Sequence, residues 1–331
     1  MLKPLIIITI GDPAGIGPEV TIKSLKDIGY RDDYYTVVIG STDILNKTIQ
    51  TCGIDLTIKP IKSVEEVKAH DKLIHVLDLN NTPSELQIGQ VDARSGKSSV
   101  EWVLKAGELA SQIENSAIVT APINKEACTL AGYKDIGHME IFQSQTKSKE
   151  VATMLIADSL RVVHLTTHRS LRIACDYVTR KNVFNKVKLT HEYFVNCGFD
   201  NPRIAVSALN PHASDGGILG NEEATQITPA ITDAKSIGIN AMGPVPADTV
   251  FTQAIDGKYD VVLAMYHDQG HIPIKVHNWE RSVSVNLGLP FVRTSVDHGT
   301  AFDIAGKGIA NHASMKEAIR LAVNLCVNKR L

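Results

Sequence analysis

Three histidines, His168, His212 and His267, follow short apolar runs that predict buried strands. Imidazole suits zinc, cobalt or nickel, and three histidines with one open position form a common catalytic metal site. Their separations match no compact metal motif, so each could instead be a hydrogen-bonded structural histidine. Because the carboxyl ends of parallel strands face the ligand crevice, their placement favours a shared site. Gly270 predicts a turn after His267, with His271 beyond it as an outer group.

Two carboxylates stand where they could orient a metal ligand or move a proton. Asp268 follows His267 directly, and Asp248 lies in the segment Pro246-Ala-Asp-Thr249. A carboxylate beside a ligating imidazole orients the ring, whereas a separate one can act as general acid or base. The sequence leaves both roles open for each residue.

Three further residues could hold an anionic substrate. Lys275 and Arg293 lie among apolar neighbours, and His138 follows a glycine. A cation in such surroundings can bind a phosphate or carboxylate, arginine through a bidentate fork. Taken singly, each cation could equally be solvated or part of a structural ion pair.

Two glycine-containing segments differ in what they predict. Gly15-Ile-Gly17-Pro-Glu-Val20 follows a strand but has Val20 in place of the third glycine, so we interpret it as a structural turn and not a dinucleotide fingerprint. The segment from Asp297 to Asn311 is a long loop with few bulky residues. A loop of this kind inside a folded domain is usually functional and predicts a ligand.

Short apolar runs alternate with helical-period segments, which predicts a largely parallel sheet covered by helices. The expected strands are Leu5 to Ile10, Thr36 to Ile39, Leu73 to Leu77, Ala117 to Thr120, Arg161 to Leu165, Ile204 to Ala208, Val261 to Met265 and Phe291 to Thr294. Expected helices include Pro18 to Asp27, Ala93 to Ile113, Asn182 to Cys197, Glu222 to Ile237 and Ser314 to Asn328. We expect one catalytic unit over residues 1–331, with a first lobe at about 1–130 plus 290–331 and a second at about 131–289.

Composition narrows the class of protein. The chain of 331 residues has 34 basic and 36 acidic residues and no block of like charge, so neither nucleic acid nor a membrane surface is expected as a partner. Its five cysteines contain no C-x-x-C pair, which favours the cytoplasm. The apolar run Leu5 to Ile10 is too short for a signal-peptide core or a transmembrane span.

Six segments together resemble the 4-hydroxythreonine-4-phosphate dehydrogenase family. They are Gly11 to Glu19, Thr120 to Glu126, Asn210 to His212, Pro246 to Thr249, Met265 to Gly270 and Gly288 to Thr300. The likeness runs from Ile8 to Asn311. It implies an α/β fold like that of isocitrate and isopropylmalate dehydrogenases, with two α/β/α lobes and a cleft between them, and not a Rossmann fold.

The resemblance also implies roles for individual positions. The metal ligands would be His168, His212 and His267. The substrate residues would be His138, Met139, Lys275, Ser284 and Arg293. The cofactor residues would be His298, Gly299, Ala301, Asp303 and Asn311. Asp248 and Asp268 are the candidate catalytic carboxylates. The family likeness further implies a homodimer whose metal site is shared between subunits.

The implied cofactors are NAD and a divalent metal, either zinc, magnesium or cobalt. In the likeness to isopropylmalate and isocitrate dehydrogenases, Asp303 would contact the adenosine ribose and Asn311 the adenine. A carboxylate at that position repels a 2′-phosphate, which favours NAD over NADP.

Two positions depart from the family pattern and bear on the substrate. Met139 stands where the family usually has threonine, and Ser284 where it has asparagine, although Asn286 could compensate. The segment from His267 to Lys275 resembles the branch of 4-phospho-D-threonate and 4-phospho-D-erythronate dehydrogenases, and Phe302 to Gly306 points the same way.

We therefore expect oxidation with decarboxylation of a 4-phosphorylated 3-hydroxy acid, giving dihydroxyacetone phosphate, carbon dioxide and NADH from 4-phospho-D-threonate. The alternative substrate is 4-phosphohydroxy-L-threonine, a precursor of pyridoxal phosphate. An unphosphorylated diol acid, or a sugar-phosphate sensor without catalysis, also stays open.

Overall fold

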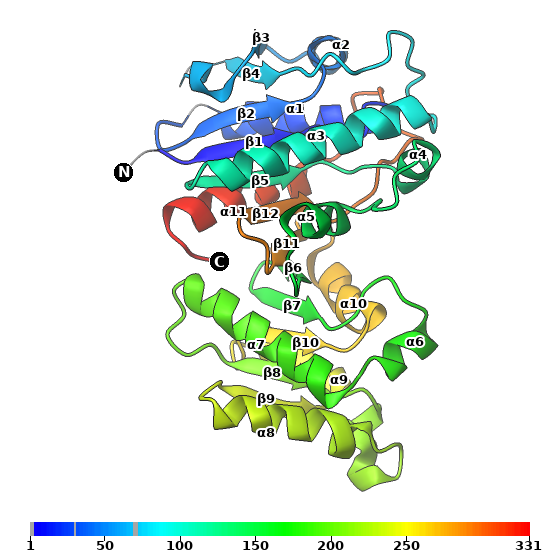
Figure 1. Ribbon diagram of the computed structural model, residues 1–331, viewed down its shortest axis with the longest axis vertical. Helices are drawn as coiled ribbons and strands as arrows, with labels where there is room; N and C mark the ends of the chain where they lie inside the picture. Colours follow the sequence, from blue (N-terminus) through cyan, green and yellow to red (C-terminus); the bar gives the residue numbers. More distant parts are fainter. Residues whose placement is uncertain (1–2, 30, 69–71) are drawn as a thin grey trace. The chain divides into compact units, whose positions relative to one another are not determined.

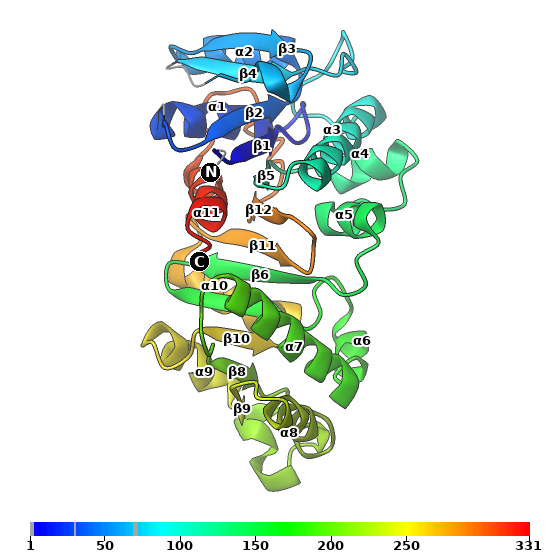
Figure 2. The same ribbon diagram turned by 60° about the vertical axis from the view of Figure 1, so that its left-hand side comes forward.

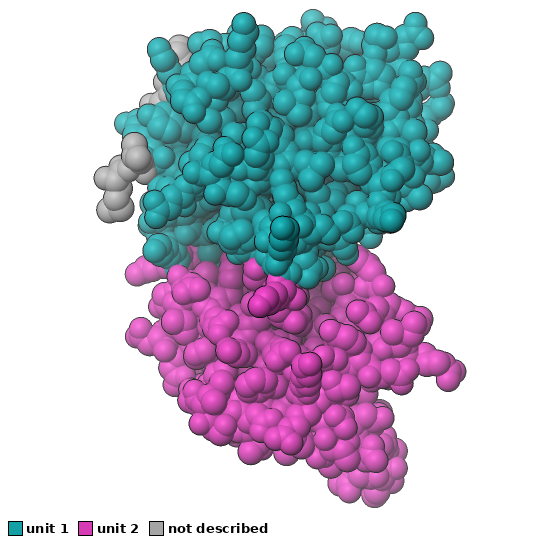
Figure 3. Space-filling model, viewed as in Figure 1, with its two compact units in different colours: residues 1–148, 289–329, 331 teal, residues 149–288, 330 magenta. Residues whose placement is uncertain are grey.

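Short runs of apolar residues in this chain form strands whose two faces are both covered. The computed structural model describes residues 3–29, 31–68 and 72–331. It divides into unit 1, residues 1–148, 289–329 and 331, and unit 2, residues 149–288 and 330 (Figure 3). Residues 131–148, which we expected in the second lobe, thus belong to unit 1. Each unit is an α/β structure (Figure 1), so the predicted class is confirmed.

The strands of unit 1 lie in the order β3-β4-β2-β1-β5-β12 and all run parallel. Their bounds are β1 Leu5–Thr9, β2 Tyr35–Ile39, β3 Thr57–Ile61, β4 Leu73–Leu77, β5 Ser116–Thr120 and β12 Val292–Val296. Every residue of β1 and β5 is buried, as expected of central parallel strands with helices on both sides.

The helices of unit 1 lie on the two faces of this sheet. They are α1 Gly17–Ile28, α2 Thr42–Cys52, α3 Ala93–Gln112, α4 Lys125–Leu130, α5 His138–Thr146 and α11 Ala313–Val327, with a 3₁₀ turn η1 at Val64–Glu66. Figure 2 shows α1 and α11 on one side, and α3, α4 and α5 on the other. Gly17 lets α1 begin directly against the end of β1, because a Cβ there would lie 2.0 Å from the Ile10 carbonyl oxygen.

The strands of unit 2 lie in the order β11-β6-β7-β10-β8-β9. Their bounds are β6 Ala152–Ala157, β7 Leu160–His164, β8 Ile204–Ser207, β9 Ala241–Val245, β10 Val261–Ala264 and β11 Val283–Leu287. Strand β6 is antiparallel to both β11 and β7, whereas β7, β10, β8 and β9 run parallel.

The helical segments of unit 2 carry several of the predicted site residues. They are α6 Leu171–Asp176, α7 Arg180–Asn196, the 3₁₀ segment η2 Pro211–Gly217, the π-helix η3 Glu223–Ile227, α8 Thr228–Ser236, α9 Ala247–Ile255 and α10 His267–Asn278. The core joins Leu155, Val162 and Val262 of the sheet to Ile274 of α10 and Phe251 of α9. Among the described residues, none of the helices combines the length and the apolar character that crossing a bilayer requires.

Two local expectations are corrected. The turn predicted at Gly270 was wrong, because Gly270 lies inside α10. Its lack of a side chain serves packing, since a Cβ there would lie 2.2 Å from Nε2 of His164. The helix expected from residue 222 to 237 is present, and the correction concerns its first turn, Glu223–Ile227, which is a π-helix that leads directly into α8.

Candidate functional site

A buried arginine marks a candidate anion-binding region in unit 1. Arg293 on β12 is only 4% exposed, and its guanidinium donates to the hydroxyl of Thr120 at the end of β5. The Thr120 hydroxyl in turn donates to Ser295 Oγ at 2.9 Å, and Ser295 Oγ donates to the Thr120 carbonyl at 3.0 Å. Burial lowers the pKa of Arg293 to about 9, so the guanidinium still carries its charge at neutral pH. The negative charge of Glu140 favours this cation, and a buried guanidinium among hydroxyl groups is compatible with a further anionic ligand.

His138 stands in the same electrostatic environment as Arg293. It begins α5, and its Nε2 is buried without a hydrogen-bond partner among the described residues. Burial, together with the positive charges of Arg293 and Lys125, holds the pKa of His138 well below its usual range. The ring is therefore neutral at pH 7 and can offer one nitrogen to a ligand. Met139 follows it in the first turn of α5 and is half-buried.

In unit 2, imidazole rings form a row along α10 and the neighbouring strand ends. The centroids of His168 and His267 are 6.0 Å apart, and those of His267 and His271 are 3.6 Å apart in a stacked arrangement. His271 also lies 4.5 Å from the ring of His164. Burial, with the neighbouring His271 second, lowers the pKa of His164 to about 3, so this ring is neutral.

His267 has the outer partner expected of a metal-binding histidine. Its Nδ1 lies 2.7 Å from Oδ1 of Asp268, which leaves Nε2 as the nitrogen available to a metal. His267 is the first residue of α10 and is half-buried, while Asp268 and His168 are exposed. The sequence therefore placed His168 and His267 correctly as neighbours.

His212 lies on the separate segment η2, which has an unusual backbone. Residues 212–216 take left-handed conformations, with φ of 52° at His212 and 54° at Ala213. Such a conformation costs roughly 1–2 kcal/mol for each residue with a side chain. The buried carboxylate of Glu223 opposes this cost by accepting bonds from the Leu209 and Asn210 amides, at 2.8 and 2.7 Å, and from the hydroxyl of Ser214.

The histidines are good divalent-metal donors, but the structure brings only two of the predicted three together. His168 and His267 fit a metal by ligand chemistry and by the Asp268 contact. Within the described parts of the chain, no group of three or more His, Cys, Asp or Glu is close enough to hold an ion. The membership of His212 in one site with the other two stays a prediction.

The other predicted residues of unit 2 occupy three different elements. Asp248 is exposed in the first turn of α9. Lys275 is half-buried in the last turn of α10, two turns from His267. Ser284 is 9% exposed on β11, and Asn286 points to the same face of that strand because it lies two residues further on.

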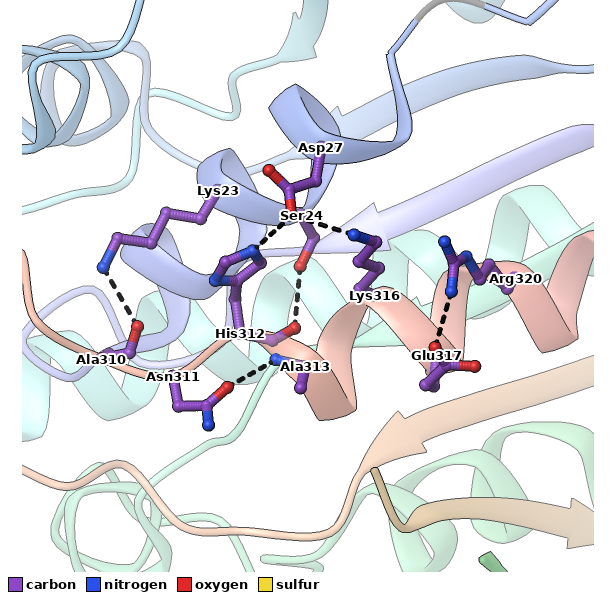
Figure 4. Close-up of polar contacts among 10 residues, drawn as sticks. All are labelled: Lys23, Ser24, Asp27, Ala310, Asn311, His312, Ala313, Lys316, Glu317 and Arg320. Carbon is purple, nitrogen blue, oxygen red and sulfur yellow. Dashed lines mark hydrogen bonds and ion pairs between the residues drawn. The ribbon is translucent and has the colours of Figure 1, made fainter. Parts of the chain in front are cut away.

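The predicted cofactor residues of unit 1 lie on one loop between β12 and α11. His298 and Ala301 are half-buried, whereas Gly299, Asp303 and Asn311 are exposed. Ala301 has a φ of 41°, and its carbonyl accepts from the Ile304 amide at 3.1 Å. Asn311 Oδ1 accepts from the amide of Ala313 at 2.9 Å and so begins α11 (Figure 4).

This loop has the features that a dinucleotide needs. The space beside Gly299 is open, because a Cβ built there meets no atom within 4 Å. A cavity of about 380 Å³ adjoins the loop and is lined in part by Gly306, Gly15 and Ile88. Asp303 and Asn311 provide an exposed carboxylate and amide for a ribose and a base. By their chemistry these exposed groups are compatible with the adenosine half of NAD, and of this loop Gly306 lines the cavity.

Comparison of the sequence and the structure with known proteins identifies the family of the chain. Residues 32–322 match the family model described as pyridoxal phosphate biosynthetic protein PdxA. The chain belongs to the PdxA family.

Relatives of this PdxA-family chain cover nearly its whole length. A protein of Halalkalibacterium halodurans provisionally named D-threonate 4-phosphate dehydrogenase is 45% identical over 97% of this chain and 96% of its own. A crystal structure of 4-hydroxythreonine-4-phosphate dehydrogenase from Klebsiella pneumoniae is 38% identical, with a TM-score of 0.89 over 98% of this chain and 99% of its own. The relatives are named dehydrogenases, which supports an oxidoreductase that acts on a CH–OH group.

The wider fold prediction is also confirmed. A beta-decarboxylating dehydrogenase from Thermococcus kodakarensis, only 14% identical, has a TM-score of 0.50 over 98% of this chain and 83% of its own. This likeness concerns the fold alone. The PdxA-family chain thus shares its fold with a beta-decarboxylating dehydrogenase, in agreement with the fold class expected from its sequence.

Several supporting residues of the PdxA-family site were missed by sequence analysis. His164 lies far in sequence from His271, whose ring it contacts. Glu223 lies 9 residues from Ser214 and 14 from Leu209, a spacing that matches no regular helix or strand contact. Thr120 had a weak signal, since it ends a predicted strand. His271 was interpreted as an outer group because its stacking on His267 depends on α10 continuing through Gly270.

Proposed function

We propose that this PdxA-family protein is an NAD- and divalent-metal-dependent dehydrogenase that oxidises and decarboxylates a 4-phosphorylated 3-hydroxy acid. The favoured substrates are 4-phospho-D-threonate and 4-phospho-D-erythronate. The observation that carries the proposal is the buried guanidinium of Arg293, held by Thr120 near Lys125 and His138. Glu140 is one nearby negative charge. Several basic groups gathered around buried hydroxyls support the binding of a further anionic group from the substrate.

In the proposed reaction, the substrate C3–H bond breaks and its hydride passes to NAD, while the hydroxyl loses its proton. The resulting 3-keto acid then loses carbon dioxide, and the electron pair of the broken C–C bond is protonated. The products from 4-phospho-D-threonate are dihydroxyacetone phosphate, carbon dioxide and NADH. Bound NAD supplies the hydride acceptor, and a bound metal supplies a Lewis acid for the developing oxyanion.

The chain's own residues would bind and orient the substrate. Arg293 binds the phosphate or carboxylate through paired N–H groups, and neutral His138 offers one nitrogen without adding charge. Lys275 and Ser284 supply further polar contacts from unit 2. Asp248 and Asp268 would move protons or orient histidines. Binding energy from the phosphate end is used to position the reacting carbon.

We propose that His168, His212 and His267 hold the metal, and that a homodimer completes the site. Two of these histidines are neighbours within one chain, and a second copy would supply the third. An exposed apolar stripe formed by Ile272 and Val276 of α10 and by Trp279 at its end supports an interface along this helix. We further propose a reducing compartment such as the cytoplasm, on the five free cysteines.

The alternative function is oxidation of 4-phosphohydroxy-L-threonine in pyridoxal phosphate biosynthesis. It is favoured by the family model and by the name of the Klebsiella pneumoniae structure. It uses the same anion site and cofactor loop. The two readings differ only in the amino or hydroxyl group at C2 of the substrate.

The test is NADH formation by metal-replete enzyme with 4-phospho-D-threonate, 4-phospho-D-erythronate and 4-phosphohydroxy-L-threonine in parallel, each with an EDTA control. EDTA-sensitive turnover of the two sugar acids alone supports the proposal. Preference for the amino acid would establish the alternative. Silence with all three would overturn both and direct the search to unphosphorylated diol acids.

A further inference from the structure

A buried ion pair on α1 holds the backbone of the loop that precedes Asn311. Glu19 and Lys23 lie one turn apart on α1, with their charged atoms 2.6 Å apart and both side chains largely buried. Glu19 is 3% exposed. Neither residue was assigned a role in the sequence, where the segment containing Glu19 was interpreted as a structural turn.

The pair binds the loop through both kinds of backbone group. The Lys23 ammonium donates to the carbonyls of Gly308 and Ala310, at 2.8 and 3.0 Å. The Glu19 carboxylate accepts from the amides of Gly308 and Ala310, at 3.2 and 2.6 Å. Figure 4 shows Lys23 reaching Ala310 beside Asn311.

These contacts give hydrogen-bond partners to backbone groups of the loop that have none in a helix or a sheet. Gly308 has a φ of 71°, outside the helical and extended regions, so its amide and carbonyl have no regular partner in a ladder or helix. Bonds to charged groups are stronger than neutral ones and hold a loop in one shape. Glu19 also lines the cavity of about 380 Å³ that adjoins Gly306.

We propose that Glu19 and Lys23 are positioning residues for dinucleotide binding, because they fix the loop of residues 304–311 in the shape that presents Asp303 and Asn311. The inference rests on the proposed NAD dependence and extends it to two residues that would not touch the cofactor. A loop fixed before binding avoids the entropy cost of ordering it when the ligand arrives.

The test compares Glu19→Gln and Lys23→Met with Asp27→Asn in the full-length protein. Asp27 also lies on α1, but it binds the side chains of His312, just before α11, and of Lys316 on α11 (Figure 4). The measurements are NAD affinity without substrate, by calorimetric titration, and amide hydrogen exchange in residues 304–311.

We expect both loop variants to weaken NAD binding on the order of tenfold and to speed exchange in the loop. Turnover at saturating NAD should be nearly unchanged, so the loss appears in KM for NAD. The Asp27→Asn protein should bind NAD within about twofold of the parent. Exposed ion pairs contribute little free energy, and this one does not contact the loop backbone.

The possible failures are distinguishable. If the unchanged protein binds no NAD, the proposed function fails, and this inference fails with it. If the unchanged protein binds NAD and the two loop variants bind it equally well, only the inference is overturned. If Glu19→Gln does not fold, Lys23→Met decides the outcome, because it leaves the buried carboxylate bonded to two amides.

Discussion

The imidazole Nδ1 of His267 lies 2.7 Å from the carboxylate Oδ1 of the very next residue, Asp268. Because this contact fixes the ring and leaves Nε2 for a ligand, Asp268→Asn should weaken divalent-metal affinity by roughly 10–100-fold. Competition with a fluorescent chelator on the apo protein measures this directly. Asp256→Asn, at the exposed end of α9, is the matched control. Unchanged affinity in Asp268→Asn would show that this carboxylate does not support a metal ligand.

Glu223 offers a second prediction, this time about stability. Replacing it with alanine leaves the amides of Leu209 and Asn210 and the hydroxyl of Ser214 without their acceptor, next to a left-handed backbone. The free energy of unfolding should fall by about 2–4 kcal/mol. Thermal unfolding gives the size, and limited proteolysis should show new cleavage within residues 209–220.

The adjacent Glu222 supplies the control for that experiment. Its carboxylate is half-buried and accepts from the Asn210 side chain at 2.8 Å. Glu222→Ala should cost less than about 1 kcal/mol, as expected for a partly solvated contact. Equal losses in the two variants would remove the special role given to Glu223.

Arg293 allows the anion site to be tested apart from the cofactor loop. Arg293→Met removes the buried guanidinium but keeps an unbranched apolar side chain, so kcat/KM for the phosphorylated substrate should fall at least about 100-fold. NAD affinity should not change. Arg293→Lys should restore only part of the activity, because an ammonium cannot form the paired contact. Full activity in Arg293→Met would exclude this arginine from substrate binding.

The sequence predicted most of the strands that carry strong apolar runs. It missed β6, although that strand is largely apolar, and it also missed strands with weaker patterns. Strand β11 alternates Val283, Ser284, Val285 and Asn286, yet all are buried, so its polar residues hid a central strand. Strand β3 contains Pro60 and has mostly exposed or half-exposed residues, as suits an edge. The local sequence pattern of a strand reflects how buried its residues usually are. It does not show which helix or strand covers each face of that strand.

The candidate site followed the same rule. His168 was singled out because it follows a predicted strand, and the carboxyl ends of parallel strands face the ligand crevice. Arg293, the second residue of β12, was singled out as a cation among apolar neighbours. Residues that act by long-range contact, such as Glu19 on the loop at Gly308, carry no signal in their neighbours. The separation of His212 from the other two histidines within one chain was equally invisible, because it depends on the path of η2.

The apolar stripe on α10 leads to a prediction about assembly. Ile272, Val276 and Trp279 are 58%, 83% and 67% exposed and lie on one helix face. Val276→Glu places a charge at the centre of the stripe and should shift a homodimer to monomer in light scattering after gel filtration. Val195→Glu, on α7, should leave the mass unchanged. A dimer that survives Val276→Glu would place the interface elsewhere.

A buried carboxyl in unit 1 gives a pH-dependent prediction. Asp12 is fully buried, with Oδ1 accepting from the Ala14 amide at 2.8 Å and Oδ2 without a partner among the described residues. Burial raises the pKa of Asp12 from 3.8 to about 6. The folded state therefore binds this proton more tightly than the unfolded state does. Its stabilising effect is present below about pH 3.8 and is lost as the pH rises through about 6.

Asp12→Asn should remove this loss of folding stability at higher pH, because the amide does not ionise. At 1.36 kcal/mol per pKa unit, the variant should gain up to about 3 kcal/mol over the parent at pH 7.5, and the gain should shrink as the pH falls toward 4.5. Thermal unfolding of both proteins across this range measures the difference. Asp43→Asn, on the half-exposed first turn of α2, should show no such trend. A pH-independent difference between parent and Asp12→Asn would mean that the carboxyl is ionised throughout, and that a charge partner compensates its burial.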